Sequence, residues 1–135
     1  VEFLLSFFHA MKKNLKALVV EDDETAQFIT SRVLEIIGIE YNMASNGIEA
    51  LDMLKTKSYD FVLMDINMPL QDGLDTVRWV RDLEDPYFKE LPIFAVTNYD
   101  TEAHKKEILS MGMNEHLGKP PDVEELKGII EKYYN

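Results

Sequence analysis

The run Phe61-Val62-Leu63-Met64-Asp65 joins four apolar side chains directly to a carboxylate. A short apolar run without polar alternation is typical of a strand that is buried on both faces of a parallel sheet. Short runs of this kind alternate with helical patterns along the chain. We predict the other strands at residues 17–20, 41–44, 92–96 and 115–117, of which 41–44 is the weakest and lies at an edge of the sheet.

Helical patterns fill the intervals between these strands. Asn46 and Glu49 have the spacing of a capping box at the start of one helix, and Asp122 and Glu125 repeat that spacing before the last helix. Strand and helix in alternation predict an α/β fold of (βα)5 type, a doubly wound five-stranded parallel sheet in one domain. The predicted helices cover 23–37, 46–54, the stretch after Asp72, 101–111 and 122–135, and their inward side chains include Ala26, Ile29, Val33, Ile36 or Ile37, Leu51, Leu54, Leu74, Val77, Trp79 and Val80.

The composition limits the classes of function. The chain has 135 residues, which suits one domain, and it has no cysteine, which excludes disulfides, thiolate zinc sites and cysteine nucleophiles. Its 25 Asp and Glu against 14 Lys and Arg give a net charge of -11, and such a surface repels nucleic acid and anionic membranes. No stretch is apolar for the ~20 residues of a membrane span. We expect a cytoplasmic protein that binds neither nucleic acid nor membrane, whose acidity serves either solubility or a functional cluster of carboxylates.

Residues 1–13 are predicted to be an N-terminal extension of a domain at residues 14–135. The apolar run at the start is short and interrupted, and Lys12 and Lys13 follow it, whereas a signal peptide has its positive charges first. Met11 before two lysines resembles a natural start. The extension is of expression origin, an upstream linker or an added helix, and the sequence leaves these alternatives open.

Polar side chains follow four of the strands at the points where they end. Each is weak support alone, because a strand-end Asp is more often a helix cap and Thr is a good strand former. In an open α/β sheet, however, ligands bind outside the carboxyl ends of the strands, near the point where the strand order reverses. We expect these residues to share one crevice: Glu21-Asp22-Asp23, Asp65, Thr97-Asn98 and Gly118-Lys119-Pro120.

This set of residues favours phosphoryl chemistry. Carboxylates within a few ångströms raise one another's pKa unless a cation joins them, and ligands that are all oxygen favour a hard cation such as Mg²⁺. A metal ion held in this way can clamp a phosphoryl group against a carboxylate nucleophile. Lys119 would balance charge on one phosphoryl oxygen, and Thr97 would donate a hydrogen bond to another. The residues indicate a site that places a phosphoryl group on Asp65.

As a set, the motifs resemble the receiver domain of response regulators and hybrid kinases, over about residues 15–134. They occur in the order of that family with typical gaps, and the resemblance implies the flavodoxin-like strand order 2-1-3-4-5. The segments that carry it are Leu18-Val19-Val20-Glu21-Asp22-Asp23, Val62-Leu63-Met64-Asp65-Ile66-Asn67-Met68-Pro69, Gln71-Asp72-Gly73, Pro92-Ile93-Phe94-Ala95-Val96-Thr97 and Gly118-Lys119-Pro120.

The resemblance implies a metal site built around the phosphoacceptor. Asp65 would accept the phosphoryl group and also bind the metal, Mg²⁺ or Mn²⁺, with Asp22 as a direct ligand. Glu21 would act through a water molecule, and Asn67 would contribute its backbone carbonyl. Asp23 follows the acidic pair at a variable position, and we interpret it as a helix cap first and a ligand second.

The resemblance also implies which residues assist transfer and switching. Thr97 and Lys119 would serve the transfer, after which Thr97 moves toward the new anion; the bond from Lys119 to Pro120 is expected to be cis. His116 stands where the family often has a Tyr or Phe that swings inward, so it is either a switch residue or an ordinary half-exposed strand residue. Asn67 and Tyr99 occupy positions that tune dephosphorylation, and the aromatic Tyr99 predicts slow autodephosphorylation.

The implied function is a phosphoacceptor switch of two-component or phosphorelay signalling. A histidine kinase or a histidine phosphotransfer protein would donate the phosphoryl group, and the domain would be no enzyme beyond accepting that group and hydrolysing its own acyl phosphate. A target protein would bind the face made by helix 101–111, strand 115–117 and the last helix. A homodimer, and the choice between a stand-alone regulator and part of a hybrid kinase, are left open.

Other interpretations explain the sequence less well. A haloacid-dehalogenase-type phosphatase needs a second Asp where Asn67 stands, and a flavodoxin-like carrier needs a phosphate loop where Glu21-Asp22-Asp23 stands. The chain has no P-loop motif. A degenerate receiver that acts as a phosphorylation-independent protein-binding module remains the alternative. His9 and His104 are predicted to be surface residues, because no metal-ligand spacing links them.

Overall fold

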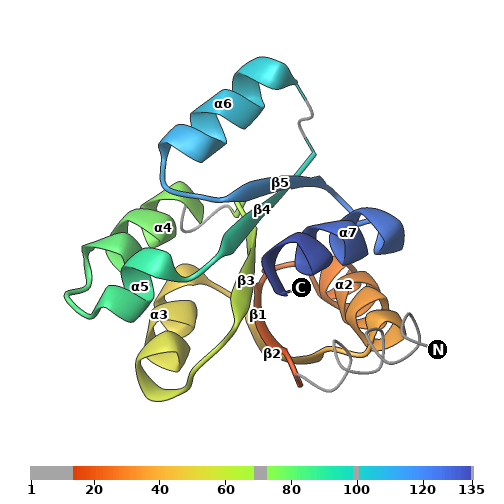
Figure 1. Ribbon diagram of the computed structural model, residues 1–135, viewed down its shortest axis with the longest axis horizontal. Coiled ribbons are helices and arrows are strands. Elements are labelled where there is room, and N and C mark those ends of the chain that lie inside the picture. Colours follow the sequence, from red (N-terminus) through yellow and green to blue (C-terminus); the bar gives the residue numbers. More distant parts are fainter. Residues whose placement is uncertain (1–13, 69–72, 99–100, 135) are drawn as a thin grey trace.

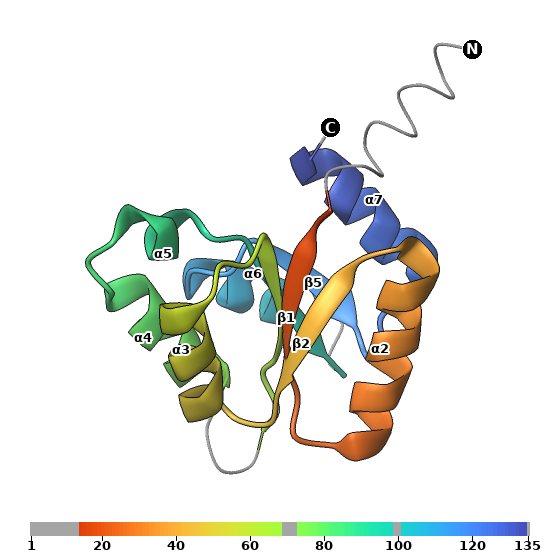
Figure 2. The ribbon, with the colours of Figure 1, turned by 90° about the horizontal axis from the view of Figure 1, so that it is seen from below.

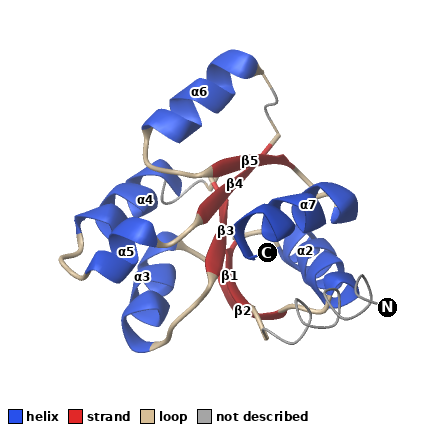
Figure 3. Cartoon of the chain, in the orientation of Figure 1, coloured by secondary structure: helices blue, strands red, loops and turns tan. Residues whose placement is uncertain are grey.

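The computed structural model describes residues 14–68, 73–98 and 101–134, in which strands and helices alternate (Figures 1 and 3). All five predicted strands are present, with ends within one residue of the predicted ones. The strands are β1 Lys16–Val20, β2 Glu40–Ala44, β3 Phe61–Asp65, β4 Ile93–Thr97 and β5 Glu115–Gly118. The helices are α2 Glu24–Ile37, α3 Gly47–Thr56, α4 Gly73–Asp82, α5 Pro86–Glu90, α6 Glu102–Ser110 and α7 Val123–Tyr134. None of these helices is long and apolar enough to cross a membrane.

The strands form one parallel sheet in the order β2-β1-β3-β4-β5, as the sequence predicted. The weakest predicted strand, β2, lies at an edge. The strand order reverses between β1 and β3, where the chain leaves one side of β1 and returns on the other. The register pairs Val20 with Met64 and Asp65 with Val96, so the carboxyl ends of the three central strands are level. The end of β3 at Asp65 therefore lies where this fold is expected to bind a ligand.

Helices lie on both faces of the sheet (Figures 1 and 2), and buried side chains form one apolar layer on each face. Successive side chains of a strand point to opposite faces, so Leu18 faces one layer while its neighbour Val19 faces the other. One layer lies under α3, α4 and α6, and the other lies under α2 and α7. Both faces being covered explains why the central strands are continuous apolar runs.

Helix α2 meets the core through a face that matches the predicted one only in part, since Val33 is buried and Ile37 packs against the core as predicted. Thr30, Val33 and Leu34 are buried, whereas Ile29 and Ile36 are 38% and 70% exposed. Apolar residues crowd two sides of this helix, so the three- and four-residue spacing fits more than one face. Asp23 caps α2 as predicted, because its Oδ2 accepts a hydrogen bond from the backbone N of Ala26 at 2.8 Å.

The segment after β3 departs further from prediction. Val77 and Val80 are buried as predicted, but Trp79, expected to face the core, is 39% exposed, and the polar Thr76 is buried. Helix α5 was not predicted at all. It begins where Asp85 accepts a hydrogen bond from Tyr87 N at 2.9 Å, and five residues are too few to show a helical period.

Candidate functional site

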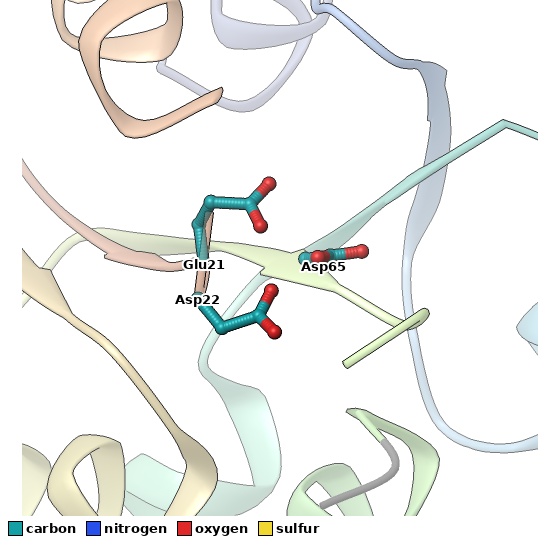
Figure 4. A group of neighbouring side chains, drawn as sticks. All are labelled: Glu21, Asp22 and Asp65. Atoms are coloured by element: carbon teal, nitrogen blue, oxygen red, sulfur yellow. The ribbon is translucent and has the colours of Figure 1, made fainter. Parts of the chain in front are cut away.

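Three carboxylates converge at the carboxyl edge of the sheet. Glu21 and Asp22 directly follow β1, and Asp65 ends the neighbouring strand β3, so their side chains point into the same space (Figure 4). One oxygen of each lies within 4.8 Å of the others. Glu21 and Asp65 are buried, at 3% and 2% exposure, while Asp22 is exposed. The structure thus brings together the acidic residues predicted from the strand ends.

Lys119 joins the two buried carboxylates. It follows β5, and its Nζ lies 2.9 Å from Glu21 Oε1 and 3.0 Å from Asp65 Oδ2. Burial raises the pKa of Glu21 to about 7, and a hydrogen bond with Asp65 acts in the same direction. Burial alone would lower the pKa of Lys119, but its hydrogen bonds to Glu21 and Asp65 outweigh burial and raise it. The ammonium group is therefore held in its charged form between the acids. The bond from Lys119 to Pro120 is cis, as predicted.

Asn67 and Thr97 lie on the other side of Asp65. The backbone N of Asn67 donates a hydrogen bond to Asp65 Oδ1 at 2.9 Å. The hydroxyl of Thr97, which is fully buried at the end of β4, donates to Asn67 Oδ1 at 3.2 Å. Both oxygens of Asp65 are thereby engaged by donors, Asn67 on one side and Lys119 on the other.

Gly73 fixes the distance between α4 and the site. A Cβ atom at this position would lie 2.5 Å from the backbone O of Asp65 and 2.6 Å from the Cα of Ile66. No side chain fits there, so glycine lets the first turn of α4 pack directly on the backbone that carries Asp65. This explains the glycine of the motif Gln71-Asp72-Gly73, whose first two residues lie outside the described part of the chain.

The donor set fits a divalent hard cation. Glu21, Asp22 and Asp65 supply oxygen ligands, and in the described part of the chain they are the only group of three or more His, Cys, Asp or Glu residues close enough to hold a metal ion. When all three are ionised, their negative charges exceed the single positive charge of Lys119 by two. A divalent cation would balance that excess, and carboxylate oxygens without His or Cys suit Mg²⁺.

His104 contacts His116, the predicted switch residue, and this contact was not predicted from the sequence. The sequence indicated an exposed residue, but His104 is half-buried near the start of α6, and its ring meets that of His116 edge to face at a centroid distance of 6.3 Å. His116 is half-buried on β5 opposite Ala95. No sequence spacing links the two histidines, because the contact joins a helix to a strand. The predicted tuning residue Tyr99, the extension 1–13 and His9 lie outside the described residues.

Comparison with known proteins identifies the family. The model of the response regulator receiver domain matches residues 17–131. The chain belongs to this family. Two-component response regulator 24 of Arabidopsis thaliana is 33% identical over 122 residues, which cover 90% of this chain and 85% of that protein. Hybrid signal transduction histidine kinase G of Dictyostelium discoideum is 33% identical over 123 residues, which cover 90% of this chain but only 4% of that kinase.

Solved receiver domains have the same fold. The receiver domain of sensor histidine kinase PA1611 from Pseudomonas aeruginosa, with a magnesium ion coordinated in its active-site cleft, has a TM-score of 0.79 and 29% identity, covering 90% of this chain and 98% of that one. A co-crystal structure of the Saccharomyces cerevisiae phosphotransfer protein Ypd1 with the receiver domain of Ssk1 gives a TM-score of 0.79 and 27% identity, covering 90% and 89%. The present chain is thus a receiver domain of two-component signalling, a family whose acidic pocket binds Mg²⁺.

Proposed function

We propose that this receiver domain is a phosphoacceptor switch in which Asp65 takes a phosphoryl group from a phosphohistidine of a kinase or phosphotransfer protein. The observation that carries the proposal is the setting of Asp65. Its carboxylate is buried at the end of β3, between the ammonium group of Lys119 and the backbone N of Asn67, and beside two further carboxylates. The co-crystal of Ypd1 with Ssk1 supports a phosphotransfer protein as one class of donor.

The transfer exchanges one bond for another. A carboxylate oxygen of Asp65 forms the bond to phosphorus while the bond from phosphorus to the donor's imidazole nitrogen breaks, and the imidazole leaves with that electron pair. Lys119, 3.0 Å from Asp65 Oδ2, is placed to hold a phosphoryl oxygen. Mg²⁺ or Mn²⁺, bound by Asp22, Asp65 and the carbonyl of Asn67 and by Glu21 through water, would neutralise phosphoryl charge.

The output would be a changed protein-binding surface. Thr97 ends β4 and directly precedes the connection into α6, so a shift of its hydroxyl toward the phosphoryl group would draw on that connection. His116 on β5 lies against His104 of the same helix and would respond with it. The face formed by α6, β5 and α7 would then change its population of two arrangements, and a target protein or a second copy of the chain would read the change.

Two further parts belong to the same proposal. The domain would catalyse nothing beyond accepting the phosphoryl group and losing it by hydrolysis, at a rate tuned by Asn67 and Tyr99. Its action would be cytoplasmic, in keeping with the absence of cysteine from the chain.

The test is the intact mass after incubation with acetyl phosphate and Mg²⁺. The parent protein should gain one phosphoryl group, and chelation of the metal should abolish the gain. Asp65→Asn should gain nothing, whereas Asp75→Asn should behave like the parent, because Asp75 lies exposed on α4. A parent that gains no phosphoryl group and binds no Mg²⁺ would contradict the proposal and support the phosphorylation-independent binding module instead.

A further inference from the structure

The side chain of Asn67 makes a contact that its expected roles do not use. As a metal ligand Asn67 would contribute its backbone carbonyl, and its backbone N already holds Asp65 Oδ1. Its side-chain Oδ1 accepts the hydrogen bond from the Thr97 hydroxyl at 3.2 Å. The sheet brings the two together, because Asp65 pairs with Val96 across β3 and β4, and Thr97 is the next residue. Asn67 therefore touches both the acceptor of the phosphoryl group and the hydroxyl expected to respond to it.

We propose that the side-chain amide of Asn67 is a latch that holds the Thr97 hydroxyl in the unphosphorylated arrangement and so sets the threshold of the switch. This inference rests on the proposed function, and it makes Asn67 a positioning residue that acts through Thr97. A hydroxyl has one proton to donate, so Thr97 cannot give that proton to Asn67 Oδ1 and to a phosphoryl oxygen at once. Movement of Thr97 requires that this bond be exchanged.

The exchange favours the phosphorylated state by a limited margin. Without the phosphoryl group, both Asp65 oxygens are already held, by Asn67 N and by Lys119 Nζ, which favours leaving the hydroxyl with the neutral amide oxygen. A hydrogen bond to an ionised acceptor is roughly twice as strong as one between neutral groups, so phosphoryl oxygens would draw the hydroxyl away. The latch would thus oppose switching before phosphorylation and yield after it.

The experiment follows the methyl group of Thr97 by NMR in the full chain. The ¹³C-labelled methyl signal is recorded without phosphodonor and with saturating acetyl phosphate and Mg²⁺, which define the two ends of the switch. In unphosphorylated Asn67→Ala, the signal should lie displaced along the line toward the phosphorylated position. The ratio of switched to unswitched protein should rise about two- to ten-fold, the equivalent of one ordinary hydrogen bond. General loosening of the loop would move the signal off that line.

The matched control is Asp75→Asn. Asp75 lies exposed on α4, where its carboxylate pairs with Arg78, whereas the hydroxyl of Thr97 bonds to Asn67. Its unphosphorylated signal should coincide with that of the parent. The backbone N of residue 67 is retained in Asn67→Ala, so its bond to Asp65 is not removed.

The outcomes separate the latch from the proposed function. A parent that gains no phosphoryl mass overturns the function and the latch together. A parent that gains the mass and shifts the Thr97 methyl, while unphosphorylated Asn67→Ala stays at the parent's position or leaves the line, overturns the latch alone. A phosphorylated parent whose Thr97 methyl does not move also overturns the latch, because there is then no movement to restrain.

Discussion

The carboxyl edge of the sheet, where the strands end, and its amino edge, where they begin, use their polar groups in different ways. At the carboxyl edge, Glu21, Asp65 and Lys119 are bound to one another through side-chain atoms. At the amino edge, most side-chain hydrogen bonds run to backbone atoms. The hydroxyl of Tyr87 donates to the carbonyl of Tyr59 and accepts from its backbone N, each at 2.7 Å. The carboxyl edge therefore joins charged side chains whose contacts can be exchanged. The amino edge uses side chains to hold the backbone of its loops in place.

Arg81 is the main tie of the amino edge. Its guanidinium, at the end of α4, donates to the carbonyls of Gly112, Phe88 and Leu91 at 2.8–3.0 Å and to Asn114 Oδ1 at 3.0 Å. One side chain thus connects α4, α5 and the loops before β4 and β5. The difference from the carboxyl edge predicts a division of roles within one sheet. The contacts of the amino edge should contribute more to stability, whereas the carboxyl edge holds unbalanced charge that a ligand can alter.

Removal of Arg81 should have the largest effect on folding. Arg81→Ala removes the donor that Arg81 supplies to three backbone carbonyls and one of the two donors to Asn114 Oδ1. Burial lowers the pKa of the guanidinium, a sign that it is partly shielded from water. We expect a loss of roughly 3 kcal/mol in the free energy of unfolding, measured by urea denaturation. Under conditions where the variant is folded, its gain of phosphoryl mass should match the parent's.

Arg78→Ala is the matched control, one turn earlier on the same helix. Arg78 is exposed and its ion pair with Asp75 spans 3.6 Å at the surface, so the loss should stay within about 0.5 kcal/mol. If Arg81→Ala and Arg78→Ala lost the same free energy of unfolding, the proposed structural role of the amino edge would be contradicted.

Removal of Lys119 should have the opposite effects to removal of Arg81: phosphorylation should slow, and stability should change little. Lys119→Ala takes away the only cation found between Glu21 and Asp65 among the described residues, and the rate of phosphorylation by acetyl phosphate should fall about 100-fold. The free energy of unfolding should change by less than about 1 kcal/mol, because Glu21 can take up a proton in place of the ion pair. A large loss of stability with unchanged phosphorylation would show that this edge, too, is structural.

The strands β1, β3 and β4 could be predicted because each one ends its apolar run on a recognisable polar residue. Val20 before Glu21 and Met64 before Asp65 mark both the end of a buried strand and its place at the carboxyl edge. Helix faces were harder. In α2, Val33 is buried as predicted, but Ile36 is exposed while the polar Thr30 is buried, so hydrophobic spacing alone did not define the whole buried face. Helix α5 was missed because its contacts, such as those of Tyr87 with Tyr59, are tertiary.

Much of the site could be predicted for the same reason, since parallel strands bring their ends together whatever the loops do. The features that could not be predicted are contacts between pairs of side chains. The role of Lys119 toward a phosphoryl oxygen stays a prediction, whereas its bond to Glu21 was not foreseen. The bond of Thr97 to Asn67 and the contact of His104 with His116 likewise depend on rotamers, which spacing does not encode.

The smallest effect should come from Tyr133, and it depends on pH. Tyr133 of α7 donates a hydrogen bond to Glu115 Oε2 at 2.8 Å, at the amino end of β5. Burial, and then the bond to this carboxylate, raise the pKa of Tyr133 from 10.0 to about 12. A raised pKa means that the folded state keeps the proton to a higher pH than the unfolded state does. The contribution to stability is therefore complete below pH 10 and is lost as the pH rises toward 12.

Tyr133→Phe should therefore be less stable than the parent at pH 8, by up to about 1 kcal/mol, and the two should converge near pH 12. Urea denaturation at several pH values checks this, and parallel stability curves across that range would show that the hydroxyl contributes nothing that depends on its proton.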